Sequence, residues 1–255
     1  MDETSLRQND TGVTEDRLLD GQIVLRQPRH GYRAGLDALL LAQACRVEPG
    51  ARVIEAGCGV GAALLCAARL NEGASFTGVE RDPAAAALAR ANAEANGLAE
   101  RVTILEADVA QPFKRLGLPP FDAAMANPPF FDDPAALRAP SPAKRGAWIA
   151  EEGLAAWTGF LLKAVREGGV ISIIHRADRL GDLLALLSPK AGSIQVRPVQ
   201  PFADAPAKRV LVRAIKTGKA PLALLPPLVL HERGESGFTP QADAILRGSA
   251  SLSWD

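Results

Sequence analysis

A single polar side chain, Asn127, ends the apolar run Ala124-Met125-Ala126 and is followed at once by two prolines and the aromatic residue Phe130. Because proline fixes its own φ and has no N–H group, Pro128 and Pro129 must end a strand here in a stiff turn. The Asn127 side-chain oxygen and the Pro128 carbonyl are both hydrogen-bond acceptors. Beside an aromatic ring, these two acceptors are suited to hold a flat group that carries an amine.

A glycine-rich loop lies upstream, in Glu55-Ala56-Gly57-Cys58-Gly59-Val60-Gly61, between a predicted strand and a predicted helix. Glycine permits a tight turn there and lets a ligand approach the backbone closely. The next predicted strand ends at Glu80, a suitable position for an acid that accepts hydrogen bonds from two ribose hydroxyls. With Ala62 counted, the loop also fits the dinucleotide pattern G-x-G-x-x-G/A, so a nicotinamide enzyme is a competing interpretation. Glu55 before the loop and the later turn at Asn127 count against it.

Alternating strand and helix patterns should position these residues. Such alternation predicts an α/β fold, in which a mostly parallel sheet has helices on both faces. The last two long strand patterns, 193–199 and 208–216, predict a C-terminal antiparallel hairpin and bring the sheet to seven strands. The other expected strands are 52–56, 75–80, 102–105, 121–126 and 169–175, and the expected helices between them are 62–70, 83–96, 153–166 and 178–187.

The domain organisation follows from the composition along the chain. Residues 1–20 are polar and acidic, which predicts a flexible N-terminus. Residues 21–255 are expected to form one domain, with 21–50 as a strand and helix extension. In that extension Leu36, Leu39, Leu40 and Ala44 repeat at helical spacing.

The overall composition narrows the class of protein. In 255 residues, 29 Lys and Arg balance 29 Asp and Glu, so the chain lacks the global basic charge of many nucleic-acid binders, although a local basic patch fits this balance. No apolar stretch is long enough to cross a bilayer, and the first residues do not form a secretory signal. The three cysteines have no CxxC spacing, which favours buried thiols in a reducing compartment. We expect a cytoplasmic protein with no membrane segment and no metal site, and a homodimer stays an open alternative.

The motifs described so far carry a family resemblance. They resemble the class I S-adenosylmethionine-dependent methyltransferases of the amino-group type, which contain an NPPF motif. This resemblance implies a Rossmann-like domain, S-adenosyl-L-methionine as cofactor and an enzyme that transfers a methyl group. The stretches that carry it are Glu55 to Gly61, Glu80, Glu106-Ala107-Asp108-Val109 and Asn127-Pro128-Pro129-Phe130.

The resemblance also implies roles for individual residues. In the family the glycine loop curls around the methionine part of the cofactor, the acid corresponding to Glu80 holds the ribose, and the acid corresponding to Asp108 hydrogen-bonds the adenine amino group. The implied cofactor-binding residues are Glu55, Gly57, Cys58, Gly59, Gly61, Glu80, Arg81, Asp108, Val109, Asn127 and Asp37, and the implied catalytic residues are Asn127, Pro128, Pro129 and Phe130.

The chemistry at Asn127 follows from its two acceptors. Methyl transfer from a sulfonium is an in-line displacement, and an amine conjugated to a ring is a poor nucleophile. Acceptors at Asn127 Oδ1 and the Pro128 carbonyl would hold the amine near the methyl group and stabilise the positive charge that develops on its nitrogen. Phe130 could stack on the base. No general base is required, because the proton is readily lost after transfer.

Within the family, the chain looks closest to the bacterial tRNA adenine-N6 methyltransferases that modify an adenine beside the anticodon of a valine tRNA. The stretches 33–40, 209–212 and 228–232 are similar to that branch. One departure is Lys144-Arg145-Gly146-Ala147-Trp148, where the branch has an Ala-Arg-aromatic-Glu run. RNA is therefore the expected partner, and basic side chains could contact its phosphates. These are Arg26, Arg29, His30, Arg33, Lys144, Arg145, Lys208 and Arg209.

Alternative functions keep the fold and change the substrate. Release-factor glutamine-N5 methyltransferases share the Asn-Pro-Pro-aromatic turn, because a carboxamide nitrogen poses the same chemical problem. Other rRNA or small-molecule methyltransferases, including O-methyltransferases, are further alternatives, although no metal cluster or catalytic Lys/His pair supports O-methylation. A non-catalytic RNA-binding scaffold that retains the fold is the alternative outside enzymes.

Overall fold

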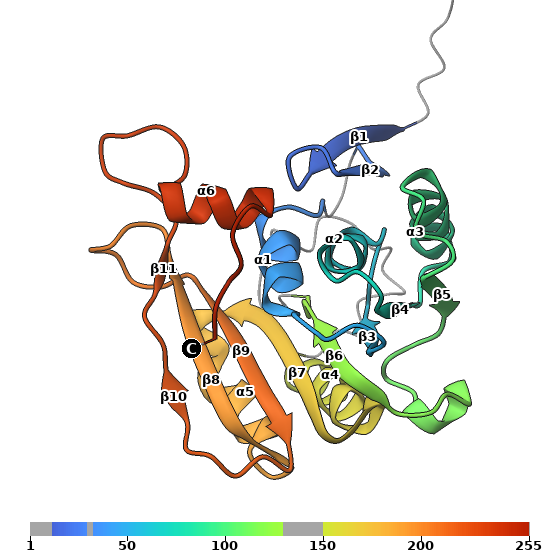
Figure 1. The fold of residues 1–255 in the computed structure, drawn as a ribbon. Coiled ribbons are helices and arrows are strands. Elements are labelled where there is room, and N and C mark those ends of the chain that lie inside the picture. The colour runs from blue at the N-terminus through green and yellow to red at the C-terminus, as the bar shows by residue number, and fades with distance from the viewer. Residues whose placement is uncertain (1–11, 30–32, 130–149, 255) are drawn as a thin grey trace, which may run out of the picture.

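The computed structural model describes residues 12–29, 33–129 and 150–254. Its centre is a sheet with the strand order β10-β8-β9-β7-β6-β3-β4-β5, and β11 also pairs with β8 (Figure 1). The seven long strands are β3 Arg52–Ala56, β4 Ser75–Glu80, β5 Val102–Glu106, β6 Phe121–Ala126, β7 Val165–Arg176, β8 Ala191–Gln200 and β9 Arg209–Lys216. Two strands of two residues each, β10 Ala223–Leu224 and β11 Leu228–Val229, extend the β8 edge.

The sheet is parallel from β5 to β7 and antiparallel only where β9 is inserted between β7 and β8. The α/β prediction of a mostly parallel sheet with a C-terminal antiparallel hairpin is therefore confirmed. Because β9 is antiparallel to both neighbours, β8 and β7 run in the same direction. The carboxyl ends of β3, β4, β6, β7 and β8 consequently lie at one edge of the sheet.

Helices cover both faces, as the alternation predicts. Neighbouring strand residues point to opposite faces, so Val53 and Met125 join one buried cluster and Ile54 and Ala124 join the other. One cluster is closed by α1 Leu36–Ala44, α2 Ala62–Leu70, α3 Pro83–Ala95 and α6 Pro240–Arg247, and the other by α4 Ala150–Ala164 and α5 Leu180–Leu187. None of the helices in the described part of the chain has the length and hydropathy of a membrane span.

The helix that follows β4 begins where its sequence predicts. Asp82 is the N-cap of α3, and its carboxylate accepts the N–H of Ala84 at 2.8 Å, while Pro83 occupies the first turn, where its missing N–H costs nothing. Thr239 caps α6 in the same way, because its hydroxyl accepts the N–H of Ala242 at 3.2 Å. These caps fix the residues immediately after β4 and the start of α6.

The prediction of a flexible N-terminus over residues 1–20 is wrong for its last part. Val13–Leu18 forms β1, which pairs antiparallel with β2 Ile23–Pro28 in a separate two-stranded sheet. Although this strand is polar, backbone pairing to β2, an ion pair between Glu15 and Arg26, and burial of Leu18 hold it in place. A low content of apolar residues therefore does not indicate disorder here.

The β1–β2 hairpin is attached to α3 by two asparagines one helical turn apart. Asn92 accepts the N–H of Arg26 at 2.9 Å and donates to its carbonyl at 2.9 Å, and Asn96 makes the same pair of bonds to Val24. These amides satisfy the free edge of β2, which would otherwise be exposed to pairing with other strands. Asn92 also donates to the Val60 carbonyl at 2.9 Å, so the hairpin is tied to the glycine-rich loop.

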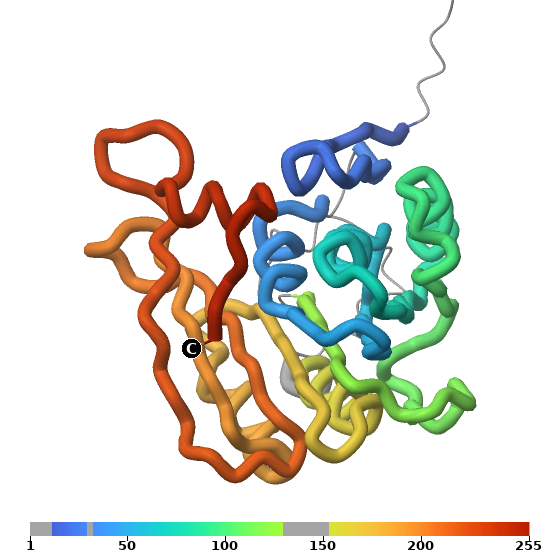
Figure 2. Tube along the Cα trace, viewed as in Figure 1, coloured from blue at the N-terminus to red at the C-terminus, as the bar shows by residue number. Residues whose placement is uncertain are grey.

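The C-terminal segment packs back over α1 and the sheet. Trp254 Nε1 donates to the Ala44 carbonyl at 3.1 Å, and Arg197 donates to the carbonyls of Pro226 and Ser253 at 2.7 and 2.6 Å. Figure 2 shows this segment running from α6 along the sheet. It therefore joins the hairpin strands β8 and β9 to the first helix of the fold.

Candidate active site

The residues predicted for the site meet because of strand register. Ala56, the last residue of β3, is paired with Val79 of β4 on one side and with Ala126 of β6 on the other. β3 and β6 therefore end side by side, so Gly57 and Asn127, the residues that follow them, lie next to each other at the edge of the sheet. In an open parallel sheet, ligands bind in the crevice outside the carboxyl ends of the strands.

The glycine-rich loop uses backbone conformations that favour glycine. Gly57, Gly59 and Gly61 have φ of +64°, +54° and +91°, in the left-handed region. Gly61 is the N-cap of α2 and its carbonyl accepts the N–H of Leu65 at 2.9 Å. The loop thus turns sharply from β3 into a helix, and its Cys58 and Gly59 N–H groups are bonded to the Val79 carbonyl and the Glu80 carboxylate.

Trp157 on α4 forms a wall of this loop, and the sequence prediction does not include it. A Cβ atom at Gly57 would stand 2.0 Å from Trp157 Cη2, so the indole lies directly against the Gly57 backbone. The only sequence signal was a tryptophan on the helix after the Asn127 turn. Its contact with a loop one hundred residues earlier depends on the tertiary fold.

Glu80 is fixed by two backbone groups. Its Oε2 accepts the N–H of Gly59 at 2.9 Å, and its Oε1 accepts the N–H of Asp82 at 2.8 Å. A carboxylate has about four lone-pair sites, so each oxygen keeps capacity for a further donor. This arrangement suits an acid that would receive two ribose hydroxyls, and it links the glycine loop to the start of α3.

Glu55 is a buried acid with an unsatisfied oxygen. Its side chain is 3% exposed, and Oε2 has no hydrogen-bond partner. Burial raises the pKa of Glu55 well above its ordinary value, the nearby Glu80 charge raises it further, and the Leu64 N–H lowers it. A buried acceptor without a partner fits a ligand that brings an N–H group. The methionine end of S-adenosylmethionine carries an ammonium, so these residues fit that cofactor.

The Asn127 turn follows β6, whose last four residues are buried. Asn127 is half-buried, Pro128 is buried and Pro129 is half-buried. Phe130 and the segment through 149 lie outside the described residues, so the aromatic member of the NPPF motif is not placed. The catalytic roles of the four motif residues stay predictions, although the turn stands beside the glycine loop as expected.

The remaining predicted cofactor residues lie around this crevice. Asp108 follows β5, and its Oδ1 accepts the N–H of Ala110 at 2.9 Å, which leaves a carboxylate at the start of a turn. Val109 is half-buried beside the second core cluster and Arg81 is exposed after Glu80. Cys58 is buried, and burial raises its thiol pKa well above the ordinary value, so it acts as a packing residue of the loop.

Asp37 of α1 is engaged by a residue of the C-terminal hairpin. Arg209 Nε lies 2.9 Å from Asp37 Oδ2, and both side chains are largely shielded from water. This ion pair joins α1 to the first residue of β9. Its role in cofactor binding stays a prediction.

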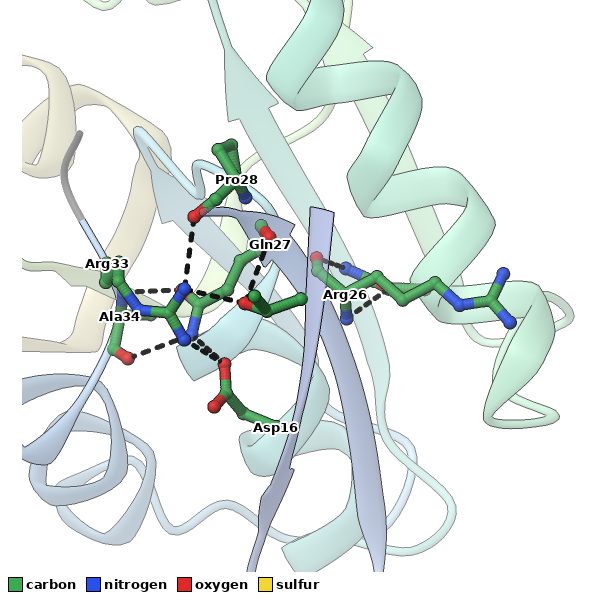
Figure 3. A network of polar contacts seen from close by, with 8 residues as sticks. Asp16, Arg26, Gln27, Pro28, Arg33 and Ala34 are labelled. Atoms are coloured by element: carbon green, nitrogen blue, oxygen red, sulfur yellow. Dashed lines mark hydrogen bonds and ion pairs between the residues drawn. The ribbon is translucent and has the colours of Figure 1, made fainter. Parts of the chain in front are cut away.

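The segment that enters α1 is held by a polar network on the β1–β2 hairpin (Figure 3). The buried Gln27 amide accepts the N–H of Ala34 at 2.9 Å and donates to Asp16 at 2.6 Å. Arg33 donates to the same Asp16 carboxylate and to the Pro28 carbonyl. The network fixes Arg33 and Ala34 beside the hairpin and so sets where α1 starts.

Three of the basic residues predicted to contact RNA are paired with acids in the structure. Arg26 and Arg33 pair with acids on the hairpin, and Arg209 pairs with Asp37. Lys208 is exposed where β9 begins. His30, Lys144 and Arg145 lie outside the described residues. Over 12–29, 33–129 and 150–254, no group of three or more His, Cys, Asp or Glu side chains could hold a metal ion.

Comparison with known proteins agrees with this geometry. The sequence model of the methyltransferase small domain matches residues 34–139. A protein from Yersinia enterocolitica named tRNA1(Val) (adenine(37)-N6)-methyltransferase is 36% identical over 46% of this chain and 47% of its own length. A release factor glutamine methyltransferase from Gloeobacter violaceus is 38% identical over 56% of this chain and 47% of its own length. The alignments thus span about half the length of these curated relatives.

A solved structure extends the comparison over most of the fold. A protein from Agrobacterium tumefaciens, described as a predicted O-methyltransferase, superposes with a TM-score of 0.72 and 29% identity over 85% of this chain and 98% of its own. The matched segment 34–139 contains the glycine loop, Glu80, Asp108 and the Asn127 turn. Residues 34–139 therefore match the methyltransferase small domain, in a chain that has the fold of class I methyltransferases.

Proposed function

We propose that the chain is an S-adenosylmethionine-dependent N-methyltransferase that acts on the N6 amine of an adenine in tRNA. The observation that carries this proposal is the register of β3 and β6, which brings the Asn127 turn beside the loop that begins at Gly57. In this proposal a site for the methyl donor and a pair of acceptors for an amine would share one crevice. A tRNA substrate would place the enzyme in the cytoplasm.

Each group in the crevice has a role in this proposal. The Glu55 carboxyl would receive the ammonium of the cofactor, and Glu80 its ribose hydroxyls. S-adenosylmethionine supplies the activated methyl group. Asn127 Oδ1 and the Pro128 carbonyl would accept the two N–H groups of the target amine. They would hold its nitrogen in line with the methyl group and stabilise the charge that grows there.

The choice of an adenine in tRNA is supported by relatives named for that activity, at 31–36% identity. The second candidate is a glutamine side chain of a protein, supported by the relative named release factor glutamine methyltransferase. Both substrates present a planar, conjugated NH₂ group, so the same two acceptors would serve either. The reacting group alone does not separate the two candidates, and substrate delivery must do so.

The test incubates the purified chain and S-adenosylmethionine with total tRNA from a strain that lacks the gene, followed by nucleoside mass spectrometry. A gain of N6-methyladenosine supports the proposal, and its absence with an active preparation rejects the tRNA substrate. A parallel incubation with a release factor, read by peptide mass spectrometry, tests glutamine. Calorimetry with S-adenosylmethionine separates either enzyme from a non-catalytic scaffold, because a scaffold that has lost the site would show no binding heat.

A further inference from the structure

A surface pocket of about 610 Å³ lies away from the glycine loop, where β8, β11 and α6 meet. It falls in the range of ligand pockets, roughly 300–1,000 Å³. Its lining includes Phe202 and Asp204 from the β8–β9 connection, His231 and Arg233 after β11, and Thr239 before α6. None of these residues takes part in the site described above.

The pocket holds the rings of Phe202 and His231 and the Arg233 guanidinium, and Phe238 stacks on His231 at its rim. The His231 and Phe238 rings lie almost parallel, with centroids 5.0 Å apart and planes at 20°. Phe202 tilts toward His231 at 6.0 Å, and the Arg233 guanidinium covers the Phe202 ring at 4.6 Å from its centroid. Phe238 is nevertheless 42% exposed. Accessible aromatic rings beside an arginine are the features that stack single-stranded nucleobases.

Two contacts keep the stack in place. Arg233 Nε donates to both oxygens of Asp204, at 2.8 and 3.0 Å, which holds the guanidinium over Phe202. His231 Nδ1 lies 2.6 Å from the Gly237 carbonyl, which can only accept, so Nδ1 carries the proton and Nε2 is the remaining polar atom of the ring. The pocket therefore has fixed flat faces and polar groups at their edges.

The pocket lies at the same edge of the sheet as the Asn127 turn. Ala126 is in register with Ile173, then Val212 and then Val196 of β8, and Phe202 lies six residues beyond Val196. Three strand spacings across the sheet, together with the six residues from Val196 to Phe202 along the chain, place the pocket on the order of 20 Å from Asn127. At about 3.4 Å per stacked nucleotide, that separation corresponds to roughly six nucleotides of one strand.

From this geometry we infer that the pocket is a second RNA-contact site, which stacks one nucleobase of the strand whose amine reaches Asn127. The inference rests on the proposed RNA substrate and adds to it a specific place of contact. Lys208, exposed at the start of β9 between the two sites, could contact an intervening phosphate. The acids Asp204 and Glu232 in the lining make the pocket unsuited to a phosphate but leave acceptors for the edge of a base.

The test uses Phe238→Ala and Phe202→Ala, with Phe202→Trp as the variant that retains a stacking face. The matched control is Leu224→Ala, because Leu224 is an apolar side chain, 70% exposed, on β10 outside the pocket. With a tRNA transcript, we expect KM to rise about tenfold in each Phe→Ala variant, because each variant loses one stacking contact, while kcat should change by no more than about twofold. Phe202→Trp and Leu224→Ala should retain the KM of the unmodified protein. An unchanged KM in Phe238→Ala and Phe202→Ala overturns the inference.

A binding assay keeps this test independent of methylation. A transcript that contains 4-thiouridine is crosslinked by light to the full chain, and the modified peptide is identified by mass spectrometry. Adducts in the segments that carry Phe202 or Phe238 support the pocket, and adducts confined to other segments reject it. If RNA binds there without gaining a methyl group, the proposed function fails while the pocket stands. If RNA is methylated and the pocket variants behave as the control does, only the pocket fails.

Discussion

The indole of Trp157 lies directly against the backbone of Gly57, closely enough that a Cβ atom there would stand 2.0 Å from Cη2 and 2.7 Å from Cζ3. Gly57 therefore meets two independent demands. Its φ of +64° favours glycine, and its α-carbon faces a large ring with no space for a side chain. The helix α4, which follows the Asn127 turn in the chain, thereby fixes the loop proposed to hold the methyl donor.

The first prediction compares two glycines of this loop. At Gly59, φ is +54° but no atom lies within 4 Å of a built Cβ, so Gly59→Ala should cost only backbone strain, about 1 kcal/mol. Gly57→Ala adds the clash with Trp157 and should cost about 3 kcal/mol. Urea unfolding of both variants measures the difference.

A double variant separates the clash from the strain. In Trp157→Ala the space opposite Gly57 opens, so adding Gly57→Ala should then cost about as much as Gly59→Ala does. Two costs that are simply additive would contradict the contact, since coupled neighbours give non-additive free energies of unfolding.

The sequence predicted the frame of this site more fully than its packing. Strand and helix periodicity, the cap at Asp82 and the glycine loop are local features, and the structure has them as expected. The Trp157 contact and the Asp37–Arg209 ion pair join residues about a hundred or more positions apart, so no local pattern could indicate them. The polar strand Val13–Leu18 was mistaken for a flexible end because its partner, not its own composition, stabilises it.

The second prediction concerns Glu80, whose oxygens accept the N–H groups of Gly59 and Asp82. Glu80→Gln replaces one acceptor by an NH₂ group that faces a backbone donor. Hydrogen bonds to charged groups contribute about 1.5–3 kcal/mol, so affinity for S-adenosylmethionine should fall about 10- to 100-fold in calorimetry.

Glu106→Gln is the control for this change. Glu106 is paired with Glu80 in the sheet register but forms an exposed ion pair with Arg90. Exposed ion pairs contribute about 1 kcal/mol or less, so its affinity should stay within a few-fold. Equal losses in the two variants would assign the effect to charge near the sheet edge and not to the position of Glu80.

The third prediction separates cofactor binding from transfer at Asn127. Asn127→Ala would remove a proposed acceptor of the target amine, so kcat should fall about 10²- to 10³-fold, the usual cost of losing one group that stabilises developing charge. Affinity for S-adenosylmethionine should change little, because in the proposed site Glu55 and Glu80 would make the main polar contacts to the cofactor. Single-turnover methylation and calorimetry measure the two quantities. An unaltered rate would remove Asn127 from the chemistry, and a lost cofactor affinity would give it a different role.

The fourth prediction is a pH dependence of stability that originates at His175, at the end of β7 and 3% exposed. Burial, together with the nearby charges of Arg179, Arg176 and Arg209 and against the opposing Asp178, lowers the pKa of His175 to about 4. The unfolded chain takes up this proton near pH 6.5 and the folded chain only near pH 4. The stability contribution is therefore fully present above about pH 6.5 and is lost as the pH falls toward 4.

From about pH 7 to about pH 5 this single group should remove about 2 kcal/mol from the free energy of unfolding. His175→Gln cannot take up the proton, so its free energy of unfolding should fall less over the same interval, by about that difference. Urea unfolding of both proteins at the two pH values measures it. Carboxylates held below their ordinary pKa, such as Asp122 beside Arg166, destabilise both proteins equally on acidification and cancel in the comparison. Parallel losses in the two proteins would show that His175 is protonated in the folded state at pH 5, which is incompatible with its burial among three arginines.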